Sequence, residues 1–242
     1  MSKTEGKTIL ITGASSGIGA ATAQVFLQAG WTVGMLARRA DRLEALAAGH
    51  DRAIPLVADV TDPAAMQAAF GLFTSRAGRL DVLFNNAGTF GRAGLIDEIG
   101  VEEFDEVVSV NLRGMFIAAR LGFAQMRSQT PQGGRIINNG SISAYVPREH
   151  AICYTTTKHA ITGMTRQLSL DGRAFDIACG QIDIGNAESE LVAGLKESQP
   201  DMHTMDVGDA ARSVLHMAGL PLRANVQFMT VMATKMPYIG RG

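Results

Sequence analysis

The chain has 242 residues, a formal net charge of −1 at pH 7 and a hydrophobic content of 46%. A chain of this length can bury one large core, and its near-zero charge lacks the basic footprint of a nucleic-acid-binding protein. Its two cysteines, Cys153 and Cys179, are too few and too irregularly placed for a disulfide framework or a metal site. We therefore expect no nucleic-acid partner and no bound metal.

The N-terminal sequence MSKTEGKTILITG enters a strand-like apolar run and shows no signal-peptide pattern. No apolar run reaches the ~18 residues that a membrane span requires. These features predict a soluble, cytoplasmic protein without a membrane partner.

Short apolar runs alternate with segments of helical pattern along the chain. The runs predicted to form strands are 8–12, 32–37, 53–58, 80–84, 135–139, 176–182 and 226–231. The segments predicted to form helices are 17–29, 41–48, 63–77, 102–128, 151–171 and 206–219. Most of the strand segments are apolar throughout, which is typical of strands that helices cover on both faces. Neither a repeat nor a linker interrupts the alternation, so we predict one α/β domain over residues 1–242, a doubly wound parallel sheet.

The first predicted strand is followed by TGASSGIG, residues 12–19. The spacing is not the GxGxxG of the usual dinucleotide fingerprint, but Gly13 permits a tight turn, Gly17 lets a pyrophosphate approach the backbone, and Gly19 allows close helix packing. The N-terminus of the next helix then faces the anion. An ordinary glycine-rich turn is the alternative. The residues predicted to bind a dinucleotide here are Gly13, Ser15, Ser16, Gly17, Ile18 and Gly19.

The end of the second predicted strand bears on the choice of cofactor. Dinucleotide folds carry an acidic residue there, about 20 residues beyond the glycine loop, to hold the ribose hydroxyls. In this chain the strand is followed by Arg38 and Arg39, and a guanidinium suits the 2′-phosphate of NADP(H). We predict a preference for NADP(H), with Arg38 and Arg39 both among the cofactor-binding residues. Arg38 is the stronger candidate because it is nearer the strand, and an Arg39 side chain that points to water is the alternative. A second alternative is a solvated arginine pair at the start of a helix.

The segment CYTTTKH, residues 153–159, offers two possible chemistries. Tyr154 and Lys158 are four residues apart and share one helix face, so a phenol and an ammonium can point into one cleft. The ammonium favours a phenolate, which suits a tyrosine that transfers protons. Cys153 and His159 lie about 120° apart around a helix and cannot pair as nucleophile and base within it. We expect Cys153 to be a small packed residue.

Several motifs in register make the sequence resemble the short-chain dehydrogenase/reductase family over nearly its whole length. TGASSGIG resembles the family's cofactor loop, ADVTD (58–62) its adenine-flanking segment, NNAG (85–88) the turn after its fourth strand, and VNLRG (110–114) the segment with its helix asparagine. Ser141 precedes Tyr154 by 13 residues, as the family's serine does, and YTTTK resembles its Tyr-x-x-x-Lys motif. The resemblance implies a Rossmann sheet of about seven parallel strands in the order 3-2-1-4-5-6-7.

The resemblance also implies roles for the matching residues. Tyr154 would exchange a proton with the substrate oxygen as hydride is transferred, and Lys158 would hold the nicotinamide ribose. Ser141 would hydrogen-bond the substrate oxygen, and Asn111 would link Lys158 to solvent through water. Taken singly, each could instead be structural: Ser141 as a cap after the fifth strand, Asn111 as a buried amide. The other cofactor-binding residues that the resemblance implies are Asp59, Val60, Asn86, Ala87, Gly88, Gly185, Ala187 and Ser189, together with Tyr154 and Lys158.

Two segments depart from the family pattern. The residues after the sixth strand read DIGNAES, with Ile184-Gly185 where relatives commonly have Pro-Gly. The C-terminal sequence lacks the Val-Asp-Gly-Gly of many relatives. Between these two departures, residues at about 186–205 are expected to form a substrate lid, with Met202 and His203 among the groups that face the substrate.

The long predicted helices at 102–128 and 151–171 carry apolar residues on several faces. The resemblance implies that such helices join subunits, so we expect a homodimer or homotetramer.

The sequence thus predicts an NADP(H)-dependent oxidoreductase that transfers hydride between its cofactor and a small carbonyl compound or secondary alcohol. One alternative is an NAD(H)-linked alcohol or sugar dehydrogenase of the same fold, in which Arg38 is a surface residue. Another is a nucleotide-sensing protein that keeps the fold without turnover. The sequence does not select among 3-oxoacyl thioesters, sugars, steroids and small ketones.

Overall fold

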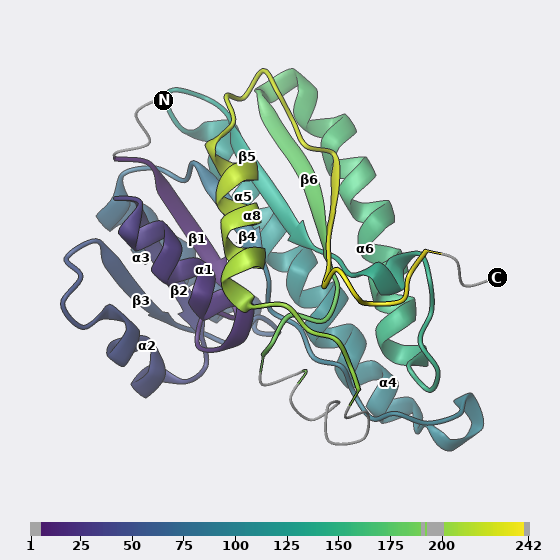
Figure 1. The fold of residues 1–242 in the computed structure, drawn as a ribbon. Coiled ribbons are helices and arrows are strands. Elements are labelled where there is room, and N and C mark those ends of the chain that lie inside the picture. The colour runs from purple at the N-terminus through teal and green to yellow at the C-terminus, as the bar shows by residue number, and fades with distance from the viewer. Residues whose placement is uncertain (1–5, 190–191, 193–200, 240–242) are drawn as a thin grey trace.

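A parallel sheet forms the centre of the computed structural model, which describes residues 6–189, 192 and 201–239 (Figure 1). Within these residues the sheet has seven strands in the order β3-β2-β1-β4-β5-β6-β7. The strands are β1 (Thr8–Thr12), β2 (Thr32–Ala37), β3 (Ala53–Val57), β4 (Val82–Asn85), β5 (Gly134–Asn139), β6 (Ile177–Ile184) and β7 (Phe228–Val231). The predicted Rossmann strand order is therefore confirmed.

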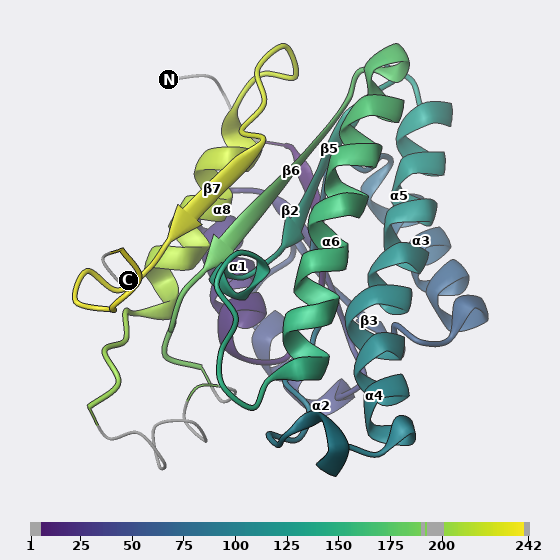
Figure 2. The same cartoon turned by 90° about the vertical axis from the view of Figure 1, so that its right-hand side faces the viewer.

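Helices cover both faces of the sheet (Figure 2). They are α1 (Gly17–Gln28), α2 (Ala40–Ala47), α3 (Pro63–Ala77), α4 (Val101–Val108), α5 (Met115–Ser128), α6 (Ile152–Asp171) and α8 (Val207–Gly219). Shorter helical segments are η1 (Ile96–Glu98), η2 (Ser109–Gly114), η3 (Ile142–Ala144) and η4 (Gly172–Phe175). Most strand and helix boundaries lie within two residues of those predicted. Asp62 caps α3, because its carboxylate accepts from the Ala64 and Ala65 amides at 2.8 and 3.1 Å.

Side chains of β1 divide between two hydrophobic clusters. Ile9 and Ile11 pack with α1 and α8 on one face, while Leu10 packs with α3 and α5 on the other. Successive side chains of a strand point to opposite faces, so an uninterrupted apolar run buries both sides. β1 and β5 each have a neighbouring strand on both sides and are buried at every residue, so the carboxyl ends of these strands have fixed positions in the sheet. The loops that follow those ends build the site described below.

The predicted helix at 102–128 is interrupted in its middle. A π-helical segment, η2, separates α4 from α5 and contains Asn111. Asn111 lies in this wider turn, where its amide reaches two neighbouring segments of the chain. Such insertions into an α-helix often occur at functional positions.

The expectation that no run is long and apolar enough to cross a membrane needs one correction. By length and composition alone, the stretch Val101–Ser128 meets that requirement, and it is the one helix to do so among the described residues. Its side chains at Val107, Ile117 and Met126 are buried within the fold. A core helix of a folded domain passes the same test, so the stretch by itself is weak evidence for a membrane span.

Candidate active site

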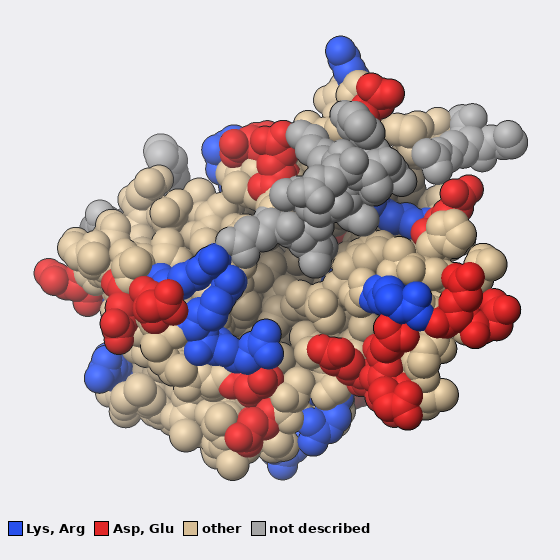
Figure 3. All heavy atoms as spheres, turned by 90° about the horizontal axis from the view of Figure 1, so that it is seen from below, with Lys and Arg blue, Asp and Glu red and all other residues tan. Residues whose placement is uncertain are grey.

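A cavity of about 480 Å³ opens where the loops leave the carboxyl ends of the strands. Parallel α/β sheets bind ligands at this edge. Figure 3 shows a hollow on this face, with Lys and Arg side chains gathered along one rim. All the predicted site residues line the cavity except Gly19, Asn111 and Gly185. These three lie behind the lining, and Gly185 packs instead against Met232, Met236 and Ile142.

The glycine loop at one end of the cavity is held by close backbone packing. Gly13 has φ +68°, a left-handed conformation that glycine adopts without strain. A Cβ on Gly19 would lie 2.2 Å from the Gly13 carbonyl oxygen, so the start of α1 must carry no side chain there. The first turn of α1 has no acidic residue, and its N-cap Ser16 makes no side-chain hydrogen bond to the helix. The amides at this helix end therefore suit an anion.

Arg39 lies over this loop. Its Nε and Nη2 donate to Ser15 Oγ at 3.2 and 3.0 Å, and Nη2 also donates to Ser16 Oγ at 2.8 Å. The alternative in which Arg39 points to water is therefore excluded, because its guanidinium turns back from the N-cap of α2 onto the loop. Arg38, the stronger sequence candidate, has a side chain that is 78% exposed and lies 3.7 Å from the Asp59 carboxylate. Both arginines line the cavity.

Asp59 forms the neighbouring wall of the cavity after β3. Burial by itself raises the pKa of this carboxyl, but hydrogen bonds from the Thr61 amide and hydroxyl, together with the charge of Arg38, outweigh it. The pKa of Asp59 is consequently lower than usual. A carboxylate that stays ionised can accept hydrogen bonds from hydroxyl groups at this position.

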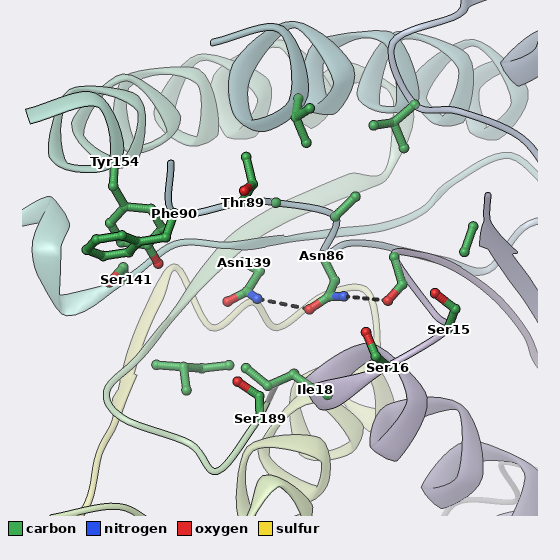
Figure 4. A pocket seen from close by; sticks show the side chains of 18 of the residues that line it. Ser15, Ser16, Ile18, Asn86, Thr89, Phe90, Asn139, Ser141, Tyr154 and Ser189 are labelled. Atoms are coloured by element: carbon green, nitrogen blue, oxygen red, sulfur yellow. Dashed lines mark hydrogen bonds between the residues drawn. The ribbon is translucent and has the colours of Figure 1, made fainter. Parts of the chain in front are cut away.

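Two asparagines bridge the middle of the cavity: Asn86, which directly follows β4, and Asn139, the last residue of β5 (Figure 4). Asn139 Nδ2 donates to Asn86 Oδ1 at 3.0 Å, and Asn86 Nδ2 donates to the carbonyl oxygens of Thr12 and Gly13 at 3.0 and 3.3 Å. Asn86 was expected from the sequence, whereas Asn139 was not. These bonds tie the glycine loop to the end of β5, and thus connect the two ends of the site.

Ser141, Tyr154 and Lys158 lie at the other end of the same cavity. Lys158 is 4% exposed; its Nζ donates to the Asn139 carbonyl oxygen at 2.8 Å and lies 5.4 Å from the centroid of the Tyr154 ring. The ring of Phe90 lies beside that of Tyr154, with centroids 4.9 Å apart (Figure 4). The helical spacing that suggested Tyr154 and Lys158 therefore does bring them together.

Ser141 also has a structural role. Its Oγ accepts from the Ser143 amide at 3.1 Å and so caps η3. The capping role and the substrate-binding role of Ser141 are therefore compatible, because a capping hydroxyl can still line the cavity and donate to a ligand.

Asn111 acts on the loop that follows β4. Its Oδ1 accepts from the Thr89 amide at 2.7 Å, and its Nδ2 donates to the Thr89 carbonyl at 2.8 Å and to Thr157 Oγ1 at 3.2 Å. The side chain is 1% exposed. These contacts join η2 to α6 beside Lys158, while the expected water link between Asn111 and Lys158 stays a prediction.

Cys153 and His159 face different surroundings. Cys153 is 2% exposed and lies near Gly91 and Val107, whereas His159 is exposed and its Nδ1 lies 2.9 Å from the Thr155 carbonyl oxygen. Each side chain thus has its own environment, in agreement with their angular separation on the helix.

The expected lid at 186–205 falls partly on residues 190–191 and 193–200, which lie outside the described residues. Its two stems, residues 186–189 and 201–205, are joined by backbone hydrogen bonds. The Glu188 amide donates to the Met205 carbonyl at 2.8 Å, and the Met205 amide donates to the Asn186 carbonyl at 3.0 Å. Ala187 and Ser189 line the cavity from the first stem.

Several lining residues were not foreseen, among them Thr89, Phe90, Asn139, Gly140, Arg148 and Asn186. All of them except Arg148 lie within two residues of a predicted site residue. A prediction that extended each motif by one or two residues would have found Thr89, Phe90, Asn139 and Gly140.

The cavity as a whole fits a nicotinamide dinucleotide. A helix N-terminus and an arginine lie at one end, an acidic wall lies beside them, and a tyrosine, serine and lysine lie at the other end. Positive charge beside a glycine loop suits phosphate, and the ionised Asp59 suits ribose hydroxyls or an adenine amino group. The donors and the cavity form are consistent with the group that the sequence implied.

Comparisons with known proteins agree with this geometry. Residues 7–200 match the family described as short chain dehydrogenase. The chain is 32% identical over 231 residues to 2-(R)-hydroxypropyl-CoM dehydrogenase of Xanthobacter autotrophicus, which covers 88% of this chain and 91% of that protein.

Two solved structures share the whole architecture. A 3-ketoacyl-(acyl-carrier-protein) reductase from Brucella melitensis, complexed with NADH, has a TM-score of 0.86 and 27% identity over 94% of this chain and 97% of its own. A short chain dehydrogenase from Burkholderia cenocepacia, in complex with NADP, has a TM-score of 0.84 and 29% identity over 96% of this chain and 98% of its own. The two similar proteins thus carry different nicotinamide cofactors.

Proposed function

This chain belongs to the short chain dehydrogenase family and is a nicotinamide-dependent oxidoreductase acting on a CH–OH or C=O group, and we propose that it prefers NADP(H). The observation that carries the preference is the Arg39 guanidinium on Ser15 and Ser16, at the end of the cavity away from Tyr154. A guanidinium binds a 2′-phosphate through charge-assisted hydrogen bonds. Arg38 adds positive charge at the same rim.

The bound nicotinamide supplies or accepts the hydride. Tyr154 donates the proton to the substrate oxygen in reduction and removes it in oxidation. Ser141 donates a hydrogen bond to the same oxygen and fixes its position. Lys158 places its ammonium beside the Tyr154 ring, and Asn111 keeps the Thr89 loop and α6 together.

Phe90 gives the substrate end an apolar wall. Its ring is partly buried against Tyr154, the side chain that would meet the reacting oxygen. We therefore expect substrates that carry an apolar ring or chain next to the carbonyl carbon, because such a group loses water contact against the ring.

Assembly and location follow as further parts of this proposal. Phe116 on α5 and Leu170 on α6 are 56% and 53% exposed, and a groove runs between these helices. We expect a homodimer or homotetramer joined there, in the cytoplasm, where the two free cysteines stay reduced. Light scattering on the purified chain measures the assembly, and a monomer at micromolar concentration contradicts it.

Residues 186–205 form the substrate lid in this proposal, supported by the paired stems at Glu188 and Met205. Binding of NADPH should protect this segment from limited proteolysis. Unchanged cleavage in the presence of saturating cofactor would contradict the assignment.

The proposal is tested by a panel of carbonyl compounds and secondary alcohols, followed by the absorbance of NADPH. We expect turnover of at least one ketone, and tighter binding of NADPH than of NADH by at least several-fold. Equal affinities for the two cofactors would contradict the NADP(H) preference, and absence of turnover across a broad panel would favour the nucleotide-sensing alternative.

A further inference from the structure

Asp183 is a buried carboxylate directly behind the catalytic end of the cavity. It is the seventh residue of β6 and is 0% exposed. It does not line the cavity, although Gly140 and Ser141 beside it do. A buried carboxylate is costly unless charge and hydrogen bonds compensate it, so its position needs a reason.

Its two oxygens are occupied by three donors. Oδ1 accepts from the Ser141 amide at 2.9 Å and from Gln181 Nε2 at 2.7 Å. Oδ2 accepts from the Tyr145 hydroxyl at 3.2 Å. A Cβ on Gly140 would lie 2.1 Å from Oδ1, so the approach of the carboxylate to the Ser141 backbone depends on that glycine.

The same short backbone segment is held from its other end by Lys158. The Lys158 ammonium donates to the Asn139 carbonyl, while the Asp183 carboxylate accepts from the Ser141 amide two residues later. Lys158 is 4% exposed and Asp183 is fully buried. An opposite charge therefore lies at each end of Asn139–Gly140–Ser141, and each buried charge offsets part of the cost of the other.

We propose that Asp183 is a positioning residue of the catalytic centre, whose ionised carboxylate holds the Ser141 backbone and balances the buried ammonium of Lys158. The inference rests on the proposed roles of Ser141, Tyr154 and Lys158. It assigns Asp183 no direct contact with substrate or cofactor. Its effect reaches the reaction through the orientation of Ser141 and through the charge balance around Lys158.

The surrounding groups determine when Asp183 is ionised. Burial raises its pKa, and the hydrogen bonds from Gln181, Ser141 and Tyr145, with the charge of Lys158, oppose that rise. Tyr145 keeps its proton over the working range, because burial and Asp183 raise the pKa of Tyr145 to about 12. Arg166 and Tyr238 are the other charged or titratable groups that act on Tyr145 from α6 and from the C-terminal segment. The catalytic centre should thus lose activity as pH falls through the raised pKa of Asp183.

The Asp183→Asn substitution removes the charge of the side chain and keeps its shape. The new amide oxygen can still accept from Ser141 and Gln181, and the new amide nitrogen can donate to the Tyr145 oxygen. A neutral acceptor forms weaker bonds than a carboxylate, so we expect kcat to fall by roughly fivefold to tenfold at neutral pH. The fall of kcat at low pH, which is the acid limb of the pH profile, should disappear. The dissociation constant of NADPH should stay within about twofold, because Asp183 does not line the cavity.

Tyr145→Phe tests the same idea near the surface, where Tyr145 is 43% exposed and the variant should fold. It removes one bond that stabilises the ionised carboxylate, so the acid limb of kcat should move to higher pH. Tyr238→Phe is the matched control, because it makes the same chemical change at a residue that acts on Tyr145. Tyr238 is not among the described donors to the Asp183 carboxylate. An acid limb that is unchanged in Tyr145→Phe overturns the proposal, whether or not Asp183→Asn folds.

A double-mutant cycle provides a readout without turnover. The unfolding free energies of the wild type, Asp183→Asn, Lys158→Met and the double variant should be non-additive, because each single change leaves the other buried charge unbalanced. Additive effects overturn the charge-balance role. If the wild type turns over no carbonyl or alcohol substrate, the proposed function fails, whereas an additive cycle with normal wild-type turnover contradicts the role of Asp183 alone.

Discussion

The two ends of the cavity are built in different ways. At the end near the glycine loop, Arg38, Arg39 and Asp59 follow β2 and β3 and are at least partly exposed. At the other end, Ser141 follows β5, Lys158 lies in α6 and Asp183 lies in β6, and all three are almost fully buried. One end carries charge on long side chains near solvent, and the other holds its polar groups in a buried hydrogen-bonded network.

The difference has an energetic consequence. An ion pair near solvent such as Arg38 with Asp59 contributes at most about 1 kcal/mol, because water and salt screen it. A buried polar group that loses its partner costs about 1–3 kcal/mol or more. Substitutions near the glycine loop should therefore tune cofactor choice, while substitutions at the buried end should change the reaction itself.

The largest effect is expected from Tyr154→Phe. The change removes the hydroxyl and keeps the ring that packs against Phe90. We expect kcat to fall by about 10²–10⁴-fold, the usual contribution of a positioned proton donor. The dissociation constant of NADPH, measured by fluorescence titration, should change little. Phe90→Leu is a control that alters the same contact without removing the proton donor, and retained turnover in Tyr154→Phe would refute the acid–base role.

An intermediate effect is expected at the exposed end. Arg39→Ala should weaken NADPH binding by about tenfold, because a charged hydrogen-bond donor to the 2′-phosphate is lost. NADH binding should stay within about twofold. Arg38→Ala is the matched control: its guanidinium is more exposed and pairs with Asp59, so its loss should weaken NADPH binding by less. Calorimetric titration measures the dissociation constants of NADPH and NADH for each variant and for the wild type. A larger effect at Arg38 would restore Arg38 as the main ligand of the 2′-phosphate, as the sequence suggested.

The sequence predicts some contacts of the site and not others, and the separation of their residues along the chain explains why. The glycine loop and the Tyr154–Lys158 pair depend on residues close in sequence, so spacing alone identifies them. The contact of Asp183 with Ser141 joins residues 42 positions apart, and its geometry follows from the register of β5 with β6. Helical periodicity likewise gives no sign of the π-helical turn at Asn111, whose side chain contacts Thr89 and Thr157, 22 and 46 positions away in the sequence.

The choice between Arg38 and Arg39 shows a further limit. The two residues are adjacent, and the sequence indicates only that a guanidinium follows β2. Arg39 is the N-cap residue of α2, with extended dihedral angles (φ −87°, ψ 94°), and its side chain contacts Ser15 and Ser16. Which side chain turns toward the loop is thus decided by backbone angles at a helix start.

A smaller effect, opposite in sign at the two ends, is expected in the pH dependence of stability. Burial raises the pKa of Asp183, so its contribution to stability is full below its ordinary value of 3.8 and is lost as pH rises through the folded value. For Asp59, burial is outweighed by hydrogen bonds from Thr61 and the charge of Arg38 and its pKa is lowered, so its contribution is full above 3.8 and is lost as pH falls.

Denaturant unfolding between pH 3 and pH 8 measures both. The stability of Asp183→Asn relative to the wild type should rise with pH, and that of Asp59→Asn should fall as pH rises from 3. If the relative stabilities of the two variants change with pH in the same direction, the two carboxylates do not differ in the way that their opposite pKa shifts indicate.

The smallest effect is expected at Cys153, which lies one residue from the catalytic tyrosine. Neighbouring residues point about 100° apart around a helix, and the Cys153 side chain lies near Gly91 and Val107 rather than in the cavity lining. Cys153→Ala should therefore leave kcat and the acid limb within about twofold of the wild type, with a stability loss of about 1 kcal/mol from the small cavity. Initial rates and denaturant unfolding of the same preparation measure the two quantities. A loss of turnover comparable to that of Tyr154→Phe would return the thiol to the mechanism, and would mean that burial beside the site is no guide to participation in it.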